Sequence, residues 1–213
     1  MKYIQKEKAP LSLRTYRETT PNASYNGFSD KKVIREALLK EQGHICAYCM
    51  RRISLDLNNY HKPKIEIEHY LSQDNFPNKT LNYQNMLGVC NGNLSGISHC
   101  DKSKDNKSLK TLNPLKFKTS EQLINYKLNG EIVSKSNNSD VEEDINIILN
   151  LNNEQLIQYR KDALDKAKKD FIKRNPKKQW IKKCLIMKLK NINQRKKRNI
   201  NHFVNMLFGI LNI

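Results

Sequence analysis

The sequence contains no run of about 18 consecutive apolar residues, and its mean hydropathy is −0.77. A membrane-spanning helix needs about 20 such residues, so none is expected. The first eight residues, Met1 to Lys8, also lack the apolar core of a secretory signal peptide. We therefore expect a cytoplasmic protein with no membrane partner, in a reducing compartment where clustered cysteines bind metal more often than they form disulfides.

Acidic residues are scarce relative to basic ones. The 213 residues include 39 Lys and Arg but 21 Asp and Glu, which gives a formal net charge of +18. The excess is concentrated between residues 160 and 199, where 17 Lys or Arg accompany three Asp. Such asymmetry predicts nucleic acid as a polyanionic partner. The alternative is a solvated, lysine-rich helix face in a chain that is also rich in Asn and Ile.

Four of the five cysteines have the spacing of a metal site. Cys46 and Cys49 form a Cys-x2-Cys pair, and Cys90 and Cys100 follow later in the chain. Four thiolates suit a tetrahedral Zn²⁺ ion with a structural role. The gap between Cys90 and Cys100 is longer than the usual two residues. His99 could therefore replace Cys100, or the four cysteines could be reduced and bind nothing.

Between the two cysteine pairs lies an acidic residue followed at once by a histidine, Glu68-His69, and Asp101 follows the last of the four cysteines. Phosphodiester hydrolysis needs an activated water and a cation that stabilises charge on the phosphate. A neutral imidazole can accept the proton of that water near pH 7. Two carboxylates favour a hard cation such as Mg²⁺ or Mn²⁺. Taken alone, Glu68-His69 would be a salt-bridged strand end, but the surrounding cysteines favour catalysis.

Residues 64–71 alternate between apolar and polar side chains, as in a short strand, and residues 86–89 predict a second strand beside it. A helix over residues 101–109 would complete a ββα unit. In a regular strand Glu68 and His69 point to opposite faces, whereas a curved strand end would bring both into one site.

The flanking regions are predicted to be mostly helical. Residues 1–30 are expected to form an extended arm, and residues 29–43 a helix whose terminal glycine suits a C-terminal stop. Beyond the ββα unit, a strand pair is expected about the turn Asn129-Gly130. A capping box at Ser139 then opens a helical region that continues to the end of the chain. Its apolar stretch 201–213 either packs on this region or docks on a partner.

The order of these residues resembles that of HNH endonucleases of the ββα-metal type, in which a zinc knuckle pins a hairpin and a helix that hold one catalytic metal. Residues 41–114 are more narrowly similar to the PtuB-type HNH component of Septu and retron anti-phage systems. The segment from Leu38 to Cys49 and the phrase Ile67-Glu68-His69-Tyr70 carry the narrower resemblance.

The resemblance implies a role for each motif residue. His69 would be the general base, and the residue before it, usually aspartate and here Glu68, would bind the catalytic metal. Asp101 stands at a motif position often held by histidine or asparagine, and would be a second metal ligand. Asn85 matches the middle position, which braces the loop and orients the backbone of the histidine. The alternative for Asn85 is an ordinary turn asparagine.

Several nearby residues are candidates for contacts with nucleic acid. Lys102 and Lys104 begin the predicted helix beside the metal and either bind phosphate or face solvent. His99 could bind metal, contact phosphate or only space the knuckle. Asn106 is either an extra ligand or a residue of the helix surface.

The sequence therefore predicts an α+β, mainly helical protein. We expect an arm and helix at residues 1–43, a zinc-stabilised ββα-metal HNH domain at 44–114, and a basic, mostly helical region at 115–213. The resemblance implies a metal-dependent HNH endonuclease that cleaves DNA or, alternatively, RNA such as tRNA. It also implies an anti-phage complex with an ATPase of the PtuA type, or a retron assembly of reverse transcriptase and non-coding DNA. The competing hypothesis is a non-catalytic, zinc-stabilised nucleic-acid-binding or adaptor module, which would not need the acidic and histidine residues of the motif.

Reversing charge in the basic region tests the predicted contact with nucleic acid. Replacing Lys177, Lys178, Lys182 and Lys183 with Glu should weaken binding, because each neutralised phosphate releases counterions and steepens the salt dependence. Fluorescence anisotropy with duplex DNA at several salt concentrations measures both effects. The zinc content of the variant should remain that of the wild type. Salt-independent binding, or equal affinity of the two proteins, would contradict the prediction.

Overall fold

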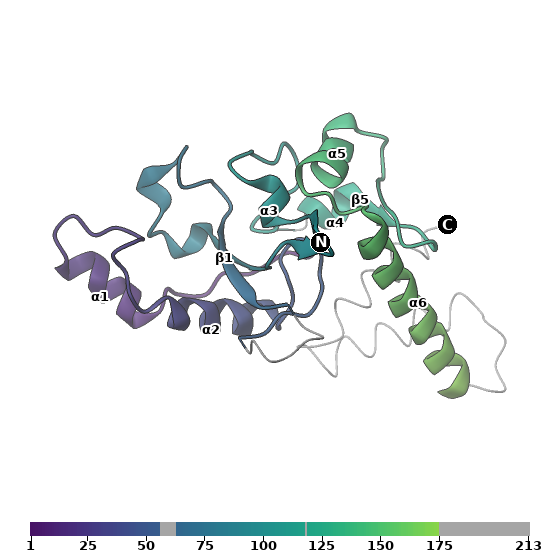
Figure 1. Ribbon diagram of the computed structural model, residues 1–213, viewed down its shortest axis with the longest axis horizontal. Helices are drawn as coiled ribbons and strands as arrows, with labels where there is room; N and C mark the ends of the chain where they lie inside the picture. The colour runs from purple at the N-terminus through teal and green to yellow at the C-terminus, as the bar shows by residue number, and fades with distance from the viewer. Residues whose placement is uncertain (56–62, 118, 175–213) are drawn as a thin grey trace.

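The hairpin of strands β1 and β2 lies at the centre of the fold (Figure 1), with helix α1 toward one end and helix α6 extending from the other. The computed structural model describes residues 1–55, 63–117 and 119–174. The predictions for the four lysines between 177 and 183 and for the stretch 201–213 lie outside the described residues, as does the fifth cysteine, Cys184.

The described residues combine α-helices with three two-stranded sheets, so the mixed α and β content predicted from the sequence is confirmed. The elements, in chain order, are α1 (Leu11–Thr19), α2 (Lys31–Gln42), β1 (Ile65–His69), the 3₁₀ turns η1 (Pro77–Lys79) and η2 (Tyr83–Asn85), β2 (Met86–Cys90), β3 (Asn93–Leu94), β4 (Ile97–Ser98), α3 (Asp101–Lys104), α4 (Thr119–Leu123), β5 (Ile124–Tyr126), β6 (Ile132–Ser134), α5 (Ser139–Glu143), the π-helical turn η3 (Asp144–Ile148) and α6 (Glu154–Arg174).

The central hairpin agrees with the predicted strand pair. β1 and β2 are antiparallel, and Glu68 lies opposite Leu87 while His69 lies opposite Met86. Every residue of β2 is buried, because helix α2 and the cysteine-bearing loop cover it. The last residue of β1, His69, therefore ends a strand that is fixed along its whole length by its partner.

Helix α2 is locked to the hairpin by one buried side chain at its C-terminal end. The amide of Gln42 accepts a hydrogen bond from the Gly88 N–H at 2.7 Å and donates one to the Gly88 carbonyl, also at 2.7 Å. A Cβ atom on Gly88 would lie 2.9 Å from Ile65 Cδ1, so a side chain at this position would displace the end of the Ile65 side chain. Gly43 then ends α2 in the left-handed region at φ 68°, as the sequence predicts.

The prediction of an extended arm over residues 1–30 is wrong in part, since residues 11–19 form α1. Pro10 precedes the helix, where its fixed φ suits a helix start and its missing N–H costs no hydrogen bond. The arm packs on the body throughout: Ile4, Leu13 and Phe28 are buried, and the Ile4 N–H donates to the Pro114 carbonyl at 2.8 Å.

Two further expectations about helices need correction. The helix expected over residues 101–109 is the single turn of α3, because Asp105 takes φ 50° and breaks it. Helix α5 is capped by Asn138, whose side chain accepts hydrogen bonds from the Asp140 and Val141 N–H groups, and not by Ser139.

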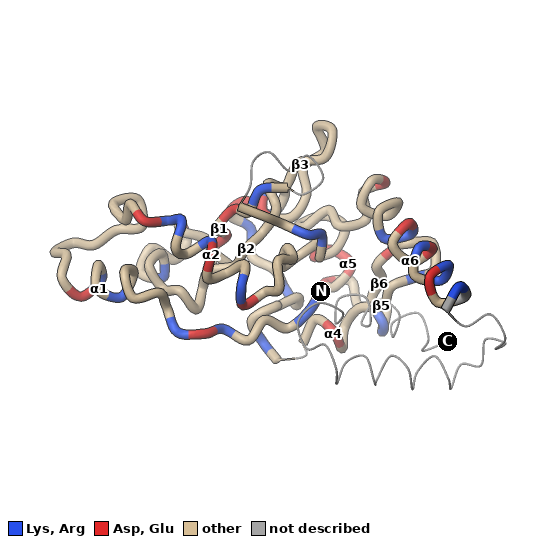
Figure 2. Tube along the Cα trace, turned by 90° about the horizontal axis from the view of Figure 1, so that it is seen from below, with Lys and Arg blue, Asp and Glu red and all other residues tan. Residues whose placement is uncertain are grey.

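Helix α6 carries charges of both signs, as Figure 2 shows along its length. Its buried residues Leu156, Arg160 and Leu164 face the body, and the Arg160 guanidinium donates to the Gly130 and Leu151 carbonyls. This helix is therefore tied to the turn between β5 and β6, the strand pair predicted about Asn129-Gly130. Across the described ranges, no helix has both the length and the apolarity to cross a membrane.

A buried carboxylate joins the C-terminal half to the segment that follows α3. Asp144, fully buried at the start of η3, accepts hydrogen bonds from the backbone N–H groups of Lys110, Thr111 and Leu112 at 2.7–2.8 Å, and from the Thr111 hydroxyl at 2.8 Å. Four donors converge on one side chain, so this carboxylate satisfies most of the polar groups at the start of the segment.

Asp144→Ala should lower the free energy of unfolding by about 3 kcal/mol, because it leaves several buried donors without an acceptor. Urea denaturation of the zinc-loaded protein, followed by far-UV circular dichroism, measures the change. Asp140→Ala in α5 is the matched control, since the side chain of Asp140 is half-exposed. Equal unfolding midpoints for the two variants would contradict the role given to Asp144.

Candidate functional site

The four predicted zinc ligands meet in one buried cluster. The Sγ atoms of Cys46, Cys49, Cys90 and Cys100 all lie within 4.8 Å of one another. The Cys46–Cys100 distance is 3.9 Å and the Cys49–Cys90 distance is 3.8 Å. A tetrahedron with Zn–S bonds of about 2.3 Å has edges of about 3.8 Å, whereas a disulfide bond is about 2.05 Å long. The four cysteines could therefore hold a zinc ion.

Backbone hydrogen bonds bring the cysteines together from three parts of the chain. The turn that carries Cys46 and Cys49 closes when the Cys46 N–H donates to the Arg51 carbonyl at 2.8 Å, and it docks on β2 through Ala47 N–H and the Gly88 carbonyl at 3.0 Å. Cys90 is the last residue of β2. The N–H of Cys100 donates to the Leu149 carbonyl at 2.8 Å, so the C-terminal half also supports the cluster.

The structure selects Cys100 over His99 as the fourth member of the cluster. His99 is fully buried, with Nδ1 3.1 Å from Cys100 Sγ, while its Nε2 has no hydrogen-bond partner among the described residues. Burial lowers the pKa of His99 to about 4. His99 therefore packs against the cluster as a neutral ring.

The electrostatics of the cluster also suit a divalent cation. Burial raises the pKa of Cys100 well above its usual value, since a thiolate loses its hydration there. Four buried thiolates would repel one another strongly unless a cation lay among them. Zn²⁺ supplies two positive charges and accepts four sulfur ligands, so the donor set fits this ion.

A cleft of about 310 Å³ opens beside the end of β1, and three of the predicted catalytic residues, Glu68, His69 and Asp101, line it, whereas Asn85 does not. Its lining residues are Ile67, Glu68, His69, Ser72, Gln73, Asp74, Asp101, Lys102, Asp105 and Asn106. Glu68 and His69, the last two residues of β1, both line this cleft. All of its lining side chains except Ile67 are polar or charged, as expected for a site that binds charged groups.

Glu68 is held by two buried partners. Its Oε1 accepts a hydrogen bond from the Tyr48 hydroxyl at 2.9 Å and lies 2.8 Å from Lys104 Nζ. Burial raises the pKa of Glu68 to about 8, and the hydrogen bond and negative charge of Asp101 add to the rise, while Lys104 opposes it. The carboxylates of Glu68 and Asp101 thus lie close enough to disfavour a second negative charge.

His69 is oriented by its backbone acceptor and by one aromatic ring. Its Nε2 lies 2.8 Å from the Thr80 carbonyl oxygen, which can only accept, so Nε2 carries the proton and Nδ1 has a free lone pair when the ring is neutral. Burial lowers the pKa of His69, so the ring is neutral at pH 7. The Tyr25 ring lies edge-on to the imidazole, with centroids 4.6 Å apart.

Asn85 connects the two sides of the loop that follows His69. Its side-chain oxygen accepts from the Leu71 N–H at 2.8 Å, and its amide donates to the Leu71 carbonyl at 2.9 Å. Its own carbonyl accepts from the Tyr70 N–H at 2.9 Å. These bonds hold the backbone directly after His69.

Of the two lysines expected to contact phosphate, the structure leaves Lys102 exposed at the cleft and buries Lys104. Lys104 is 0% exposed, and its Nζ contacts Glu68. The prediction that Lys104 binds phosphate or faces solvent is therefore wrong. Asn106 lines the cleft and donates to Asp74.

Sequence reasoning missed Tyr25, Tyr48 and Thr80, which contact His69 or Glu68 across 11 to 44 residues of chain. The sequence does indicate that Lys104 lies near the site, because it follows Asp101 by three residues and so shares a helix face with it. Tyr25 and Thr80 have no such local signal.

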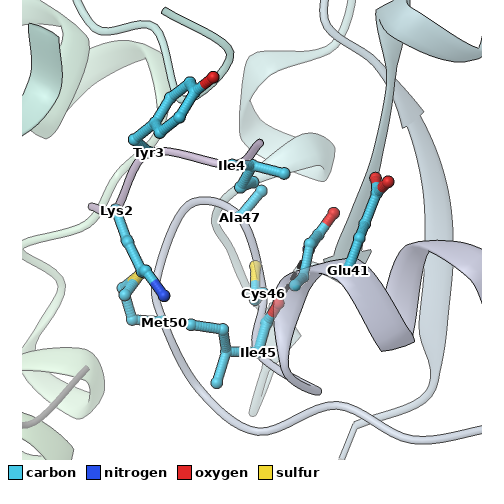
Figure 3. A pocket seen from close by; sticks show the side chains of 9 residues that line it. Lys2, Tyr3, Ile4, Glu41, Ile45, Cys46, Ala47 and Met50 are labelled. Carbon is cyan, nitrogen blue, oxygen red and sulfur yellow. Dashed lines mark hydrogen bonds between the residues drawn. The ribbon is translucent and has the colours of Figure 1, made fainter. Parts of the chain in front are cut away.

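A second cavity, drawn in Figure 3, lies between residues 2–4 of the N-terminal arm and the turn that carries Cys46. Its volume is about 20 Å³, enough for about one water molecule and too small for a substrate. The cleft beside β1 is therefore the candidate substrate site.

Comparison with known proteins points to a defence protein. No family model matches the chain. The chain is 29% identical over 121 residues to the Septu protein PtuB of Bacillus thuringiensis, in an alignment that covers 54% of this chain. The chain is similar to a Septu protein. The aligned part spans 42% of the length of that relative.

Cys49→Ala should yield protein that is insoluble or unfolded, because zinc binding energy in such clusters is folding energy. The purified wild type should contain about one zinc per chain by elemental analysis. Cys184→Ala, which changes the cysteine outside the predicted ligand set, should keep both zinc and fold. Folded wild-type protein without zinc, or a folded Cys49→Ala variant with wild-type stability, would contradict the zinc assignment.

Proposed function

We propose that this chain is a metal-dependent HNH-type endonuclease that hydrolyses phosphodiester bonds, with DNA as the favoured substrate and RNA as the alternative. One observation carries the proposal: a neutral imidazole with a free Nδ1 shares a polar cleft with two carboxylates. Base, cation ligands and space for a phosphate are the parts that metal-assisted hydrolysis requires.

His69 is the general base of the proposed reaction. The Thr80 carbonyl keeps the proton on Nε2, so Nδ1 is free to take a proton from the attacking water. The lowered pKa of the ring, caused by burial, keeps it unprotonated at pH 7 and ready for this step. Asn85 holds the backbone that follows His69 and so limits movement of the strand end.

Glu68 and Asp101 would hold the catalytic cation. Both carboxyl groups line one cleft, and the pKa of Glu68 is raised to about 8 by burial and by Asp101, so a bound cation would favour the ionised form of Glu68. Bound Mg²⁺ or Mn²⁺ would stabilise charge on the scissile phosphate and the leaving oxygen.

The neighbours of Glu68 prepare it for this role. Tyr48 donates to Oε1, and the Lys104 ammonium lies 2.8 Å from the same oxygen. Both contacts favour the ionised carboxylate, and they hold it in one orientation. Lys102, exposed at the cleft, is placed to contact a phosphate oxygen of the substrate.

The zinc ion has a structural role in this proposal. Cys90 ends β2 and Cys100 immediately precedes Asp101, so zinc would fix the start of α3 relative to the hairpin. The distance between the base and the cation ligands then depends on the cluster.

Similarity to the Septu protein PtuB supports a place in an anti-phage defence complex. In the proposed complex an ATPase of the PtuA type, or a retron assembly of reverse transcriptase and non-coding DNA, controls the nuclease. The net charge of +18 supports nucleic acid as the substrate. A non-catalytic nucleic-acid-binding or adaptor module is the competing function, and an activity assay separates the two.

His69→Ala should lower the rate of cleavage by about 10²- to 10⁴-fold, because the general base is lost, while zinc content and partner binding stay unchanged. The chain, co-purified with its genomic neighbour, is assayed on plasmid, single-stranded DNA and tRNA with Mg²⁺ or Mn²⁺. His44→Asn is the matched control, since His44 is exposed, lies outside the cleft and has φ 61°, which Asn tolerates. Equal rates for wild type and His69→Ala would overturn the catalytic assignment. No metal-dependent cleavage of any substrate would favour the binding module.

A further inference from the structure

The N-terminal arm contributes a side chain to the candidate site. Tyr25, six residues before α2 and outside the predicted nuclease domain, places its ring against His69 with a centroid separation of 4.6 Å and an interplanar angle of 90°. No other ring contact of His69 is present among the described residues. The contact joins positions 44 residues apart in sequence, so it is a product of the folded arm.

The loop that carries Tyr25 is held firmly. The Tyr16 hydroxyl of α1 donates to the Ser24 carbonyl at 3.1 Å and accepts from the Ser24 N–H at 3.3 Å. The Phe28 N–H donates to the carbonyls of Ser24 and Tyr25, and the Phe28 side chain is buried. A helix of the arm therefore supports the residue that precedes Tyr25, and a buried aromatic anchors the residues that follow it.

The start of α2 fixes the Tyr25 ring from a second direction. Lys31 Nζ lies 4.7 Å from the centroid of the Tyr25 ring, within the range of a cation–π contact. The half-buried Tyr25 ring thus contacts both a cation at the start of α2 and the imidazole of His69.

His69 needs such support because the hydrogen bond that its ring makes among the described residues fixes one ring atom and not the ring plane. With Nε2 held by the Thr80 carbonyl, the imidazole can still tilt about that bond, and a tilt redirects the Nδ1 lone pair. A perpendicular aromatic ring removes this freedom, since an edge-to-face pair has a preferred geometry worth about 0.5–1.5 kcal/mol.

We propose that Tyr25 is a positioning residue for His69, so that the N-terminal arm completes the catalytic site. This inference rests on the proposed nuclease function. Tyr25 acts through the imidazole and does not touch the reacting atoms. The ring makes the contact, so Phe should replace Tyr25 and an aliphatic residue should not.

The alternative is that Tyr25 only packs the arm onto the body. A packing role would change stability but would leave the orientation and tautomer of His69 intact in protein that remains folded. The test must therefore observe the imidazole of His69 directly and measure kcat and KM separately.

Tyr25→Leu should lower kcat by about 10- to 100-fold on the nucleic acid that the wild type cleaves, with little change in KM, because a misdirected base costs rate and not substrate binding. Tyr25→Phe should stay within about twofold of the wild type. Tyr3→Leu is the matched control: Tyr3 makes a similar edge-on contact with Phe117, with centroids 5.2 Å apart and an angle of 88°, away from the cleft.

Long-range ¹H–¹⁵N correlation spectra of the whole zinc-loaded chain, labelled at histidine nitrogen, report the His69 tautomer without any need for activity. The wild type and Tyr25→Phe should show one Nε2-protonated species, and Tyr25→Leu should show broadened or mixed signals. If the wild type proves inactive as a nuclease, these spectra still decide whether Tyr25 orients His69.

Should Tyr25→Leu fail to fold, Tyr16→Phe provides a second route. It removes the hydroxyl that holds Ser24 and so loosens the loop without touching His69, and it should change kcat and the His69 signals in the same direction, by less. Wild-type kcat and wild-type His69 signals in folded Tyr25→Leu, or in Tyr16→Phe where that is the folded variant, would overturn the proposal.

Discussion

The four-cysteine cluster is the constraint on which the rest of the structure depends. It joins a tight turn, the end of β2 and the residue before α3, and the backbone hydrogen bonds of the turn and of Cys100 support it. Sulfur atoms 3.8–3.9 Å apart on opposite edges suit a zinc ion, and four buried thiols without a cation would be a costly arrangement. Because Cys100 immediately precedes Asp101, the same cluster sets where the cleft carboxylate lies relative to β1.

At the end of β1, buried charge replaces apolar packing. Lys104 is 0% exposed and lies 2.8 Å from Glu68, which is also bound by Tyr48. A buried ion pair is weak as a source of stability, since desolvation of both partners opposes their attraction. Its place beside a polar cleft, with Asp101 as a further neighbour, fits a site that keeps a carboxylate oriented for a cation. The two halves of the proposed chemistry, base and cation ligands, are therefore held by different devices: a backbone carbonyl for His69 and an ion pair for Glu68.

Segments outside the motif support it from both sides. On the N-terminal side, Gln42 bonds both backbone groups of Gly88 and fastens α2 to the hairpin, while Tyr25 borders His69. On the C-terminal side, the Leu149 carbonyl accepts a hydrogen bond from the Cys100 N–H, and Asp144 accepts hydrogen bonds from the backbone that follows α3. The motif is thus one part of a larger packed unit, and changes far from the cleft can alter its geometry.

The sequence by itself determined the local features. Alternation predicted β1 and Gly43 predicted the end of α2, because each depends on neighbours within a few residues. The Cys-x2-Cys pair with two later cysteines predicted the cluster of four cysteines, because this set is typical of zinc sites. The order of the motif residues also predicted that Glu68, His69 and Asp101 belong to one site. It could not choose between Cys100 and His99, and it described residues 1–30 as an extended arm where α1 forms. The tertiary structure decided the burial of Lys104, the four donors on Asp144 and the ring of Tyr25 against His69. These contacts join residues 32 to 44 positions apart, and no periodicity in a single segment encodes a partner that only the folded chain brings near.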